Sequence, residues 1–600
     1  MVTYEGGVKV TENRLLQKIE CKSGGTTFRT YEFTYQTPYR QNTTTLTHIG
    51  CTTPSGKSLN PLRFFYGEGN TAYAYTKAET QLLEWYTNAQ PGQLIVSKGK
   101  FDYGTDDDGL ISLPNKNPYW QHYRNSTWFR RSQNRYDNQY SGTEKIFLYS
   151  GLNSGFADPM PNLTTEAGFT DVFTANIDGK YEEEVIKVNN TVSGSYDRLQ
   201  FKVYSVNLYT GLALKYTRVF NFSTVLTDAD GGKSIHPKFH FTGDFNGDGR
   251  MEVLSVSNNH PFGWTDKPGR CYLFDLETNI KLYEGAPFTF YKEFVGSNQG
   301  NAEAAAQNSD RLFALDYDGD GKTDICLINN NGTYIYTFDV TGSTYSVRLV
   351  SSYTALKKST LEGRQLMIGE FNGDGKPDFL LSPKTGASDW AIYYAMGNGQ
   401  FERAAVSITS RSSTDEFLLQ DVNSDGLTDV IKKMGSSGFY TYLTRPGASY
   451  TSDSYTSFVY SGPVIVPTDI NSRNYFHQLV ALKDGKVTRF SYPRNDTKEK
   501  QLTGAVNSLG VVSKNHYQML NEAGYYYTKG YGAVYPFENF HGPFSVPVSR
   551  EQYFFRDSLI SSRNFKKRKS SSFNTAFIVI LFSFTSLVKR WYMAKLNGRK

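Results

Sequence analysis

The chain has 600 residues, several times the length of a domain with a single core, so we expect several domains or one large repeat array. Apolar residues make up 38%, and the 44 Tyr, 41 Phe and 53 Gly favour half-buried strands joined by tight turns. Residues 558–600 carry ten Lys or Arg and no acid; subtracting these ten charges from the net +6 leaves −4 for the rest, which argues against a nucleic-acid surface there.

The first 95 residues are expected to form short β-strands. In the segment Phe28–Tyr35, alternation places Tyr31, Phe33 and Tyr35 on one face of a strand. The residues Met1–Glu5 show neither a basic start nor an apolar run. We interpret this as a protein that stays inside the cell or as a chain that starts inside a longer reading frame.

From about residue 96 to residue 500, the chain repeats one pattern of an apolar run, a short acidic Gly-rich loop and a second apolar run. The clear copies read GDFNGDGRMEVLSV, LDYDGDGKTDICLI, GEFNGDGKPDFLLS and QDVNSDGLTDVIKK. Their third acidic positions, Asp248, Asp320, Asp374 and Asp425, are spaced by 72, 54 and 51 residues. Short strands repeated at such intervals predict propeller blades or a β-solenoid.

Weaker copies flank the clear ones. They lie at Asn176–Glu182, at Asp469–Arg473 and at Asp106–Gly109, and each lacks part of the acidic pattern. Four clear and two or three weaker units predict six or seven blades. The expected fold class is therefore all-β, an integrin-type β-propeller over residues 96–500 with flanking β domains at 1–95 and 501–556.

Each clear loop has the form D-x-[DN]-x-D-G-x-x-[DE], which suits a hard cation such as calcium. Calcium takes six to eight oxygens at about 2.3–2.6 Å, and alternate side chains of a tight loop, a backbone carbonyl at position seven and an acid at position nine supply them. The proposed ligands are the side chains of Asp244, Asn246, Asp248 and Glu252 with the carbonyl of Arg250; of Asp316, Asp318, Asp320 and Asp324 with the carbonyl of Lys322; of Glu370, Asn372, Asp374 and Asp378 with the carbonyl of Lys376; and of Asp421, Asn423, Asp425 and Asp429 with the carbonyl of Leu427. The longer Glu370 departs from the pattern.

The alternative is that these loops are metal-free hairpin turns. Four loops in register favour the metal, because clustered carboxylates without a cation repel one another. Such a metal would be structural, tying two strands of a blade together.

Residues 557–600 form a basic and apolar tail. Its uncharged stretch Phe573–Val588 has 16 residues, while a membrane span needs about 20. We interpret the tail as an out-of-frame segment in preference to a membrane anchor.

No motif carries a catalytic reaction. The chain has no GxSxG, HExxH or phosphate loop, and its four cysteines show no metal-site spacing. His236 and His240 would lie about 13 Å apart in a strand, too far to share a zinc ion. The cysteines are interpreted as small buried hydrophobic residues in preference to a Cys21–Cys51 disulfide. The protein is therefore expected not to be an enzyme.

The four loops resemble the VCBS/FG-GAP repeats of integrin-type propellers, over about two thirds of the chain. The stretches LLQKIECKSGGTTFRTYEFTYQ and TTLTHIGCTTPSGKSLNPLRFFYGEG are similar to the region before the propeller in SpvB-like and insecticidal-toxin-complex B components. VNSLGVVSKNHYQML and YYYTKG are similar to the stretch after it. The whole resembles the N-terminal half of RHS/YD-repeat polymorphic-toxin proteins of the Bacteroides type, although it lacks YD repeats and a toxin domain.

The resemblance implies an extracellular or cell-surface protein in which the propeller docks or gates. The leading hypothesis is a non-catalytic, calcium-stabilised scaffold and binding module of an RHS/toxin-complex-like secreted or surface protein. It would bind a protein partner or toxin-complex component, and the chain would be a truncated fragment of that protein. The alternative is a free-standing calcium-dependent surface adhesin that binds glycan or protein. A third hypothesis is an enzyme with its active site on the propeller face.

Removing calcium is predicted to lower the melting temperature. We expect Asp320→Ala to lower it more than Asp178→Ala, because Asp178 belongs to a weak copy of the loop. Thermal unfolding in millimolar calcium measures both variants, and equal effects would contradict the ligand assignment.

Overall fold

The structure is a computed structural model, and β-strands dominate it. The described residues are 2–5, 8–11, 15–36, 45–67, 76–81, 94–100, 108–114, 145–147, 149–150, 155–156, 171–180, 182–193, 196–207, 211–222, 237–257, 270–291, 309–422, 427–435, 437–445, 449–457, 464–468, 478–483, 486–491, 501–519, 545–554 and 558–564. Among them only the turn α2 (Lys358–Leu361) is α-helical. The expected all-β class is confirmed.

Five sheets are antiparallel meanders of four consecutive strands. Their strands are β13 (Asp171–Ala175), β14 (Glu184–Ser193), β15 (Tyr196–Asn207) and β16 (Gly211–Phe222); β17 (Pro237–Gly243), β18 (Glu252–Ser257), β19 (Cys271–Asp275) and β20 (Ile280–Gly285); β21 (Arg311–Leu315), β22 (Asp324–Ile328), β23 (Thr333–Thr341) and β24 (Thr344–Tyr353); β25 (Leu366–Gly369), β26 (Asp378–Leu381), β27 (Trp390–Ala395) and β28 (Phe401–Val406); and β29 (Asp415–Gln420), β30 (Asp429–Met434), β31 (Gly438–Arg445) and β32 (Ser449–Ser457).

Two further sheets complete this array. One consists of β8 (Leu94–Lys100), β9 (Asp108–Pro114) and β10 (Lys145–Phe147). The other takes β33 (Val464–Thr468), β34 (Gln478–Lys483) and β35 (Lys486–Ser491) from the end of the array, and its fourth strand is β7 (Thr76–Gln81) from before the array. The short pairs β1 (Val2–Glu5) with β2 (Val8–Thr11) and β11 (Tyr149–Ser150) with β12 (Gly155–Phe156) stand apart from these sheets.

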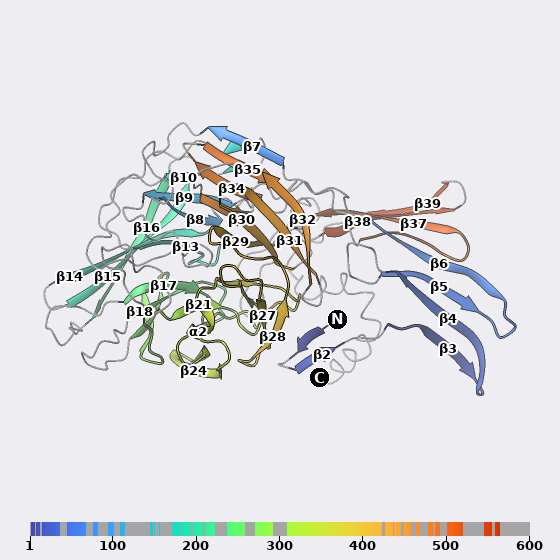
Figure 1. The fold of residues 1–600 in the computed structure, drawn as a ribbon, viewed down its shortest axis with the longest axis horizontal. Coiled ribbons are helices and arrows are strands. Elements are labelled where there is room, and N and C mark those ends of the chain that lie inside the picture. The colour runs from blue at the N-terminus through green and yellow to red at the C-terminus, as the bar shows by residue number, and fades with distance from the viewer. Residues whose placement is uncertain are drawn as a thin grey trace.

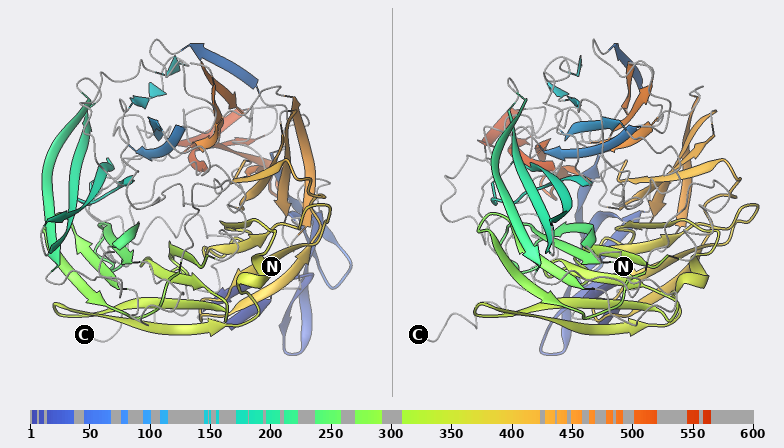
Figure 2. Two further views of the ribbon diagram at one scale, coloured as in Figure 1. Left: turned by 60° about the vertical axis from the view of Figure 1, so that its left-hand side comes forward. Right: turned by 90° about the vertical axis from the view of Figure 1, so that its left-hand side faces the viewer.

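The first strands of successive sheets lie against one another. β8 contacts β13, β13 contacts β17, and β17 contacts β21; β25 contacts β29, β29 contacts β33, and β33 contacts β8. No sheet closes on itself, since every strand order in the described part of the chain is linear. In Figures 1 and 2 the separate sheets surround a common centre, with β7 beside β35.

The hydrophobic core lies between the sheets. Each of five buried clusters draws its side chains from two successive sheets. The second strands β18, β22, β26 and β30 contribute to two clusters each, so they are buried on both faces. On β18, for example, Val253 packs toward β13–β16 while Leu254 packs toward β21–β24. This explains why these strands read as continuous apolar runs in the sequence. A hairpin turn at Gly397–Gly399 joins β27 to β28.

An eight-stranded sheet extends from one side of the array (Figure 1). Its order is β3 (Lys18–Ser23), β4 (Thr26–Gln36), β5 (Thr45–Thr52), β6 (Ser58–Tyr66), β36 (Leu502–Val506), β37 (Val511–Met519), β38 (Ser545–Phe554) and β39 (Ser558–Asn564). The pairing of β6 with β36 joins the two flanking segments, which the sequence had separated into two domains.

Strand pairing also shifts two expected boundaries. β7 lies inside 1–95 but pairs with the array, and β39 lies inside 557–600 but pairs with β38. Phe573–Val588 falls outside the described residues; within the described ones, no helix is long and apolar enough to cross a membrane.

Local predictions for the first flank agree with the structure. On β4 the side chains of Tyr31, Phe33 and Tyr35 are half-buried, while Glu32 and Thr34 between them are exposed. All four cysteines are free thiols. Cys21 on β3 and Cys51 on β5 are separated by β4, which places them too far apart for a disulfide.

The pairing of β7 with β35 can be tested by cross-linking. Ala78 lies directly opposite Arg489, and opposed residues of antiparallel strands have the Cα separation of about 4.5–5.5 Å that a disulfide needs. The variant Ala78→Cys/Arg489→Cys is expected to form this disulfide, detected by peptide mapping. Ala78→Cys/Thr488→Cys is the control, because Thr488 faces the other side of the strand. Equal cross-linking of both variants would contradict the register.

Candidate metal centres

The predicted acidic loops all connect the first strand of a sheet to its second strand. We name them by their first residue: the 176 loop (Asn176–Glu184), the 244 loop (Asp244–Glu252), the 316 loop (Asp316–Asp324), the 370 loop (Glu370–Asp378) and the 421 loop (Asp421–Asp429). Because the sheets share one strand order, the five loops lie at equivalent places in their sheets.

One hydrogen bond is common to all five loops. The backbone N–H at position two donates to the carboxylate at position nine, which begins the second strand. The donor–acceptor distances are 3.0 Å for Ile177–Glu184, 2.9 Å for Phe245–Glu252, 3.3 Å for Tyr317–Asp324, 3.1 Å for Phe371–Asp378 and 2.9 Å for Val422–Asp429. The residue at position two is itself buried in the core. This bond turns the ninth carboxylate inward and gives the loops a common shape.

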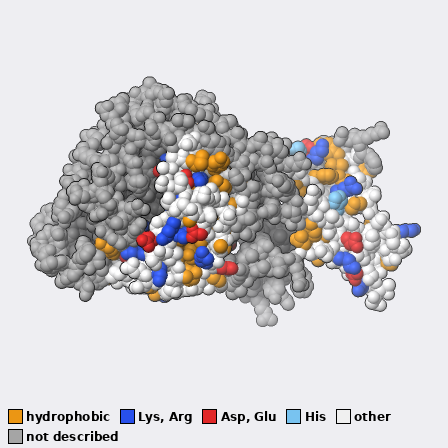
Figure 3. All heavy atoms as spheres, in the orientation of Figure 1, with side chains coloured by type: hydrophobic (Ala, Val, Ile, Leu, Met, Phe, Trp, Pro, Cys, Tyr) orange, Lys and Arg blue, Asp and Glu red, His pale blue; other side chains and the backbone are white. Residues whose placement is uncertain are grey.

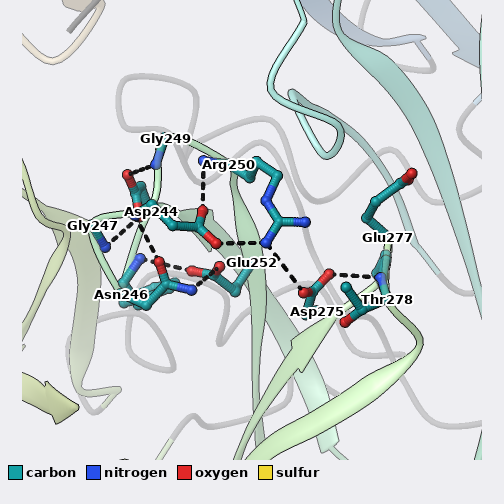
Figure 4. A network of polar contacts seen from close by, with 12 residues as sticks. Asp244, Asn246, Gly247, Gly249, Arg250, Glu252, Asp275, Glu277 and Thr278 are labelled. Atoms are coloured by element: carbon teal, nitrogen blue, oxygen red, sulfur yellow. Dashed lines mark hydrogen bonds and ion pairs between the residues drawn. The ribbon is translucent and has the colours of Figure 1, made fainter. Parts of the chain in front are cut away.

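In the 244 loop, the Asp244 carboxylate is surrounded by backbone N–H groups (Figure 4). It accepts hydrogen bonds from Gly247 at 2.6 Å, Asp248 at 3.1 Å and Gly249 at 2.8 Å. Gly247 and Gly249 have φ of 78° and 84°, a backbone conformation that glycine adopts without strain. The Asn246 amide donates to Glu252 Oε1 at 2.7 Å.

Arg250 supplies positive charge to one side of the same loop. Its guanidinium lies 2.6 Å from Asp248 Oδ2 and 3.7 Å from an oxygen of Asp275 on β19. The charge of Asp248, at position five of this loop, is therefore partly neutralised by the protein itself.

The 316 loop repeats this backbone geometry with acids at every ligand position. Asp316 accepts from Gly319 at 2.8 Å, from Asp320 at 3.1 Å and from Gly321 at 2.8 Å. No Lys or Arg in the described part of the chain forms an ion pair with Asp316, Asp318 or Asp324. Lys322 instead donates to the carbonyl of Phe338 at 3.1 Å.

The 370 loop keeps the shape despite its longer first residue. Glu370 accepts from the N–H groups of Gly373 and Gly375, each at 2.6 Å. Asp374 lies 3.3 Å from Lys376 Nζ, and both oxygens of Asp378 accept backbone N–H groups, from Phe371 and Ala395. The carboxylates of this loop thus have protein partners.

The 421 loop is described only in part, because Asn423 and Asp425 fall outside the described residues. Asp429 is buried and accepts from Val422 at 2.9 Å and from Thr444 at 2.7 Å. Leu427, the expected carbonyl ligand, is buried as well.

Two loops bring three carboxylates together. Oxygen atoms of Asp244, Asp248 and Glu252 lie within 4.8 Å of one another, and so do those of Asp316, Asp318 and Asp324. The acids of the 370 loop do not form such a group among the described residues. A donor set made only of oxygens fits a hard cation such as calcium.

Burial opposes charge on these carboxylates. Desolvation, reinforced by neighbouring acids, raises the pKa of Glu252 to about 9 and that of Asp324 to about 7. The pKa of Asp378 rises to about 8 for the same main reason. Ionised forms at neutral pH therefore need a compensating positive charge close by.

Successive loops are also joined by their backbones. The N–H at position eight donates to the carbonyl at position one of the preceding loop: Met251 to Asn176 at 2.9 Å, Thr323 to Asp244 at 2.7 Å and Thr428 to Glu370 at 2.5 Å. Pro377 occupies position eight of the 370 loop and has no N–H to donate.

These links explain residues that the ligand pattern had overlooked. A Cβ on Gly243 would lie 2.5 Å from the Thr323 side chain, and a Cβ on Gly369 would lie 2.8 Å from that of Thr428. The 370 loop has Pro377 at position eight instead of threonine, and the residue directly before the preceding 316 loop is Leu315 instead of glycine. The pairing of a glycine before one loop with a threonine in the next is a signal that the sequence contained.

The structure and the sequence together define an all-β protein built from repeated four-stranded sheets. A family model described as FG-GAP-like repeat matches residues 370–431, which include the 370 and 421 loops. No curated protein matches the chain.

Several solved structures contain similar chains. A chain of the Photorhabdus luminescens Tc holotoxin pore shares 11% identity at a TM-score of 0.44, over 92% of this chain and 21% of that chain. A chain of a TcdB2–TccC3–Cdc42 complex shares 11% identity at a TM-score of 0.39, over 92% and 22%. The Bacillus licheniformis rhamnogalacturonan lyase shares 12% identity at a TM-score of 0.31, over 74% and 79%. This protein thus spans about a fifth of the length of the toxin chains.

The contact between Gly243 and Thr323 gives a stability prediction. Gly243→Ala is expected to destabilise the protein by about 1–3 kcal/mol, because the new methyl group has to displace the side chain that joins two loops. Urea denaturation followed by intrinsic fluorescence measures the loss. Gly50→Ala is the control, since its Cβ would meet the Glu32 carbonyl at an ordinary 3.9 Å. A similar loss in both variants would count against the inter-loop contact.

Proposed function

We propose that this protein is a non-catalytic scaffold and binding module whose repeat array is a seven-bladed β-propeller stabilised by calcium. The observation that carries the proposal is the pair of three-carboxylate groups in the 244 and 316 loops, at equivalent positions of neighbouring sheets. The acids of these loops accept hydrogen bonds from the loop backbone, so they determine the shape of the loops.

The order of the sheets supports a ring. Contacts between first strands run from β8 through β13 and β17 to β21, and from β25 through β29 and β33 back to β8. β7, which precedes the array in the chain, then pairs with β35 and completes the last sheet. In this arrangement the seven sheets are the blades, and one sheet shared by both ends of the array closes the circle.

Asp244, Asp248 and Glu252 would hold one calcium ion, and Asp316, Asp318 and Asp324 another. A bound calcium ion would supply the positive charge that buried, mutually repelling carboxylates require. Since Arg250 already pairs with Asp248, we expect the 316 loop to bind calcium more tightly than the 244 loop.

A protein partner is supported by the exposed apolar side chains of the eight-stranded sheet. Most of the exposed large apolar residues of the described chain lie on or beside it, namely Leu15, Leu16, Ile19, Phe28, Leu59, Phe65, Leu509 and Phe554. Figure 3 shows apolar side chains gathered over this part of the molecule. Exposed apolar surface of this kind marks interaction sites.

The sequence of the same flanks supports one class of partner. Their similarity to toxin-complex B components and to RHS proteins leads us to propose a toxin-complex component as partner and an extracellular or cell-surface location.

Calcium binding to the 316 loop can be tested directly. Calcium at about 100 times its dissociation constant is expected to stabilise the chain by about 2–3 kcal/mol, seen as a rise in melting temperature that a chelator reverses. Asp316→Asn should remove most of this rise and one binding event in titration calorimetry, because Asp316 belongs to the three-carboxylate group of this loop.

Asp339→Asn serves as the matched control, because Asp339 lies on β23 of the same sheet, pairs with Arg348 and is not part of the three-carboxylate group. An absence of calcium uptake by the unmodified protein would refute the calcium part of the proposal.

A further inference from the structure

The 176 loop contains a lysine ammonium among its acids. Lys215, on the outermost strand β16, places its Nζ 2.9 Å from Asp178 Oδ2 and 2.7 Å from Glu184 Oε1. The two carboxylates are nearly buried, with 6% and 5% of their side-chain surfaces exposed, whereas Lys215 retains 25%. A buried ion pair of this kind is costly to break, because removing one partner leaves an uncompensated charge.

These acids occupy positions three and nine of the common loop. Glu184 Oε2 accepts the N–H of Ile177, as the ninth carboxylate does in every other loop, and its second oxygen meets the ammonium. Positions one and five, which are acidic in the 244 and 316 loops, are Asn176 and Lys180 here. Lys180 adds a second ammonium, 2.7 Å from Asp178 Oδ2. Asp178 and Glu184 therefore receive positive charge from the protein itself.

A β-bulge accompanies the placement of Lys215. In the pairing of β15 with β16, Val203 is opposite Tyr216 and Tyr204 is opposite Leu214, so Lys215 is the extra residue. Bulges of this kind re-aim a side chain relative to the regular alternation of a strand. The irregularity thus coincides with the residue of β16 whose ammonium lies among the acids of the loop.

We infer that Lys215 is a built-in cation that replaces calcium in the 176 loop and makes the sheet β13–β16 independent of calcium. The inference rests on the proposed calcium binding by the other loops. On this inference, the acids of the 176 loop are compensated by a lysine of the protein, whereas those of the 316 loop are compensated by a calcium ion bound from solution.

The inference changes the expectation for Asp178. Asp178→Ala would leave Lys215 with only one of its two acids, so the loss of stability should be the same with and without calcium. The quantity to compare between Asp178→Ala and Asp320→Ala is therefore the difference in melting temperature with and without calcium.

Hydrogen exchange of the full chain, followed by mass spectrometry with calcium or with a chelator, tests the inference. In the unmodified protein, peptides of β21–β24 should exchange faster in chelator while those of β13–β16 stay unchanged. Lys215→Met should speed exchange in β13–β16 about tenfold or more in both conditions. Lys281→Met is the control, since Lys281 lies on the outermost strand of the next sheet and pairs only with an exposed acid, Glu284.

A second variant separates the role of charge from that of shape. Lys215→Met/Glu184→Gln removes one uncompensated carboxylate and should recover part of the protection lost in Lys215→Met. The inference is overturned if β13–β16 loses protection on chelation as β21–β24 does, or if Lys215→Met behaves like the control. A protein in which no sheet responds to calcium would refute the proposed function, while Lys215→Met in chelator would still decide whether the ammonium supports its loop.

Discussion

A carboxylate buried at the beginning of the second strand organises each repeat of this protein. Its hydrogen bond from the N–H at position two is present in all five described loops, and it ties the loop to the buried side chain beside that N–H. In the 244, 316 and 370 loops the same burial disfavours the ionised carboxylate and raises its pKa. The feature that shapes the loop thus creates a demand for positive charge or further hydrogen bonds.

The repeats meet this demand with different partners. Lys215 lies among the acids of the 176 loop, and Arg250 covers one side of the 244 loop. Backbone N–H groups of the neighbouring strand satisfy Asp378 and Asp429. The 316 loop has the most acids and no ion pair on three of them within the described chain, which makes it the repeat best suited to an external cation. Loops with the same backbone geometry therefore differ in the groups that compensate the charge of their carboxylates.

The repeat pattern predicted local structure well because its determinants lie close together in the chain. The loop register, the glycines at positive φ and the hairpin at Gly397–Gly399 all depend on residues a few positions apart. The alternation on β4 was visible for the same reason.

The sequence could not predict features that join distant segments. Nothing near Thr76–Gln81 indicates that this strand pairs with β35, and nothing in β6 indicates β36 as its neighbour. Lys215 lies 31 residues after Glu184 on a bulged strand, so a search for acidic loop residues passes over it. These are effects of three-dimensional packing, which overrides local pattern.

The junction of β6 with β36 constrains how the chain is assembled on the ribosome. The hydrogen bond from Thr503 Oγ1 to the Phe65 carbonyl spans 438 residues. At synthesis rates of about 5–20 residues per second, the edge of β6 waits roughly 20–90 s for its neighbour. β7 similarly waits for β35. The N-terminal strands β6 and β7 thus present unpaired edges while the intervening array is translated, and such edges are sites where a nascent chain can aggregate.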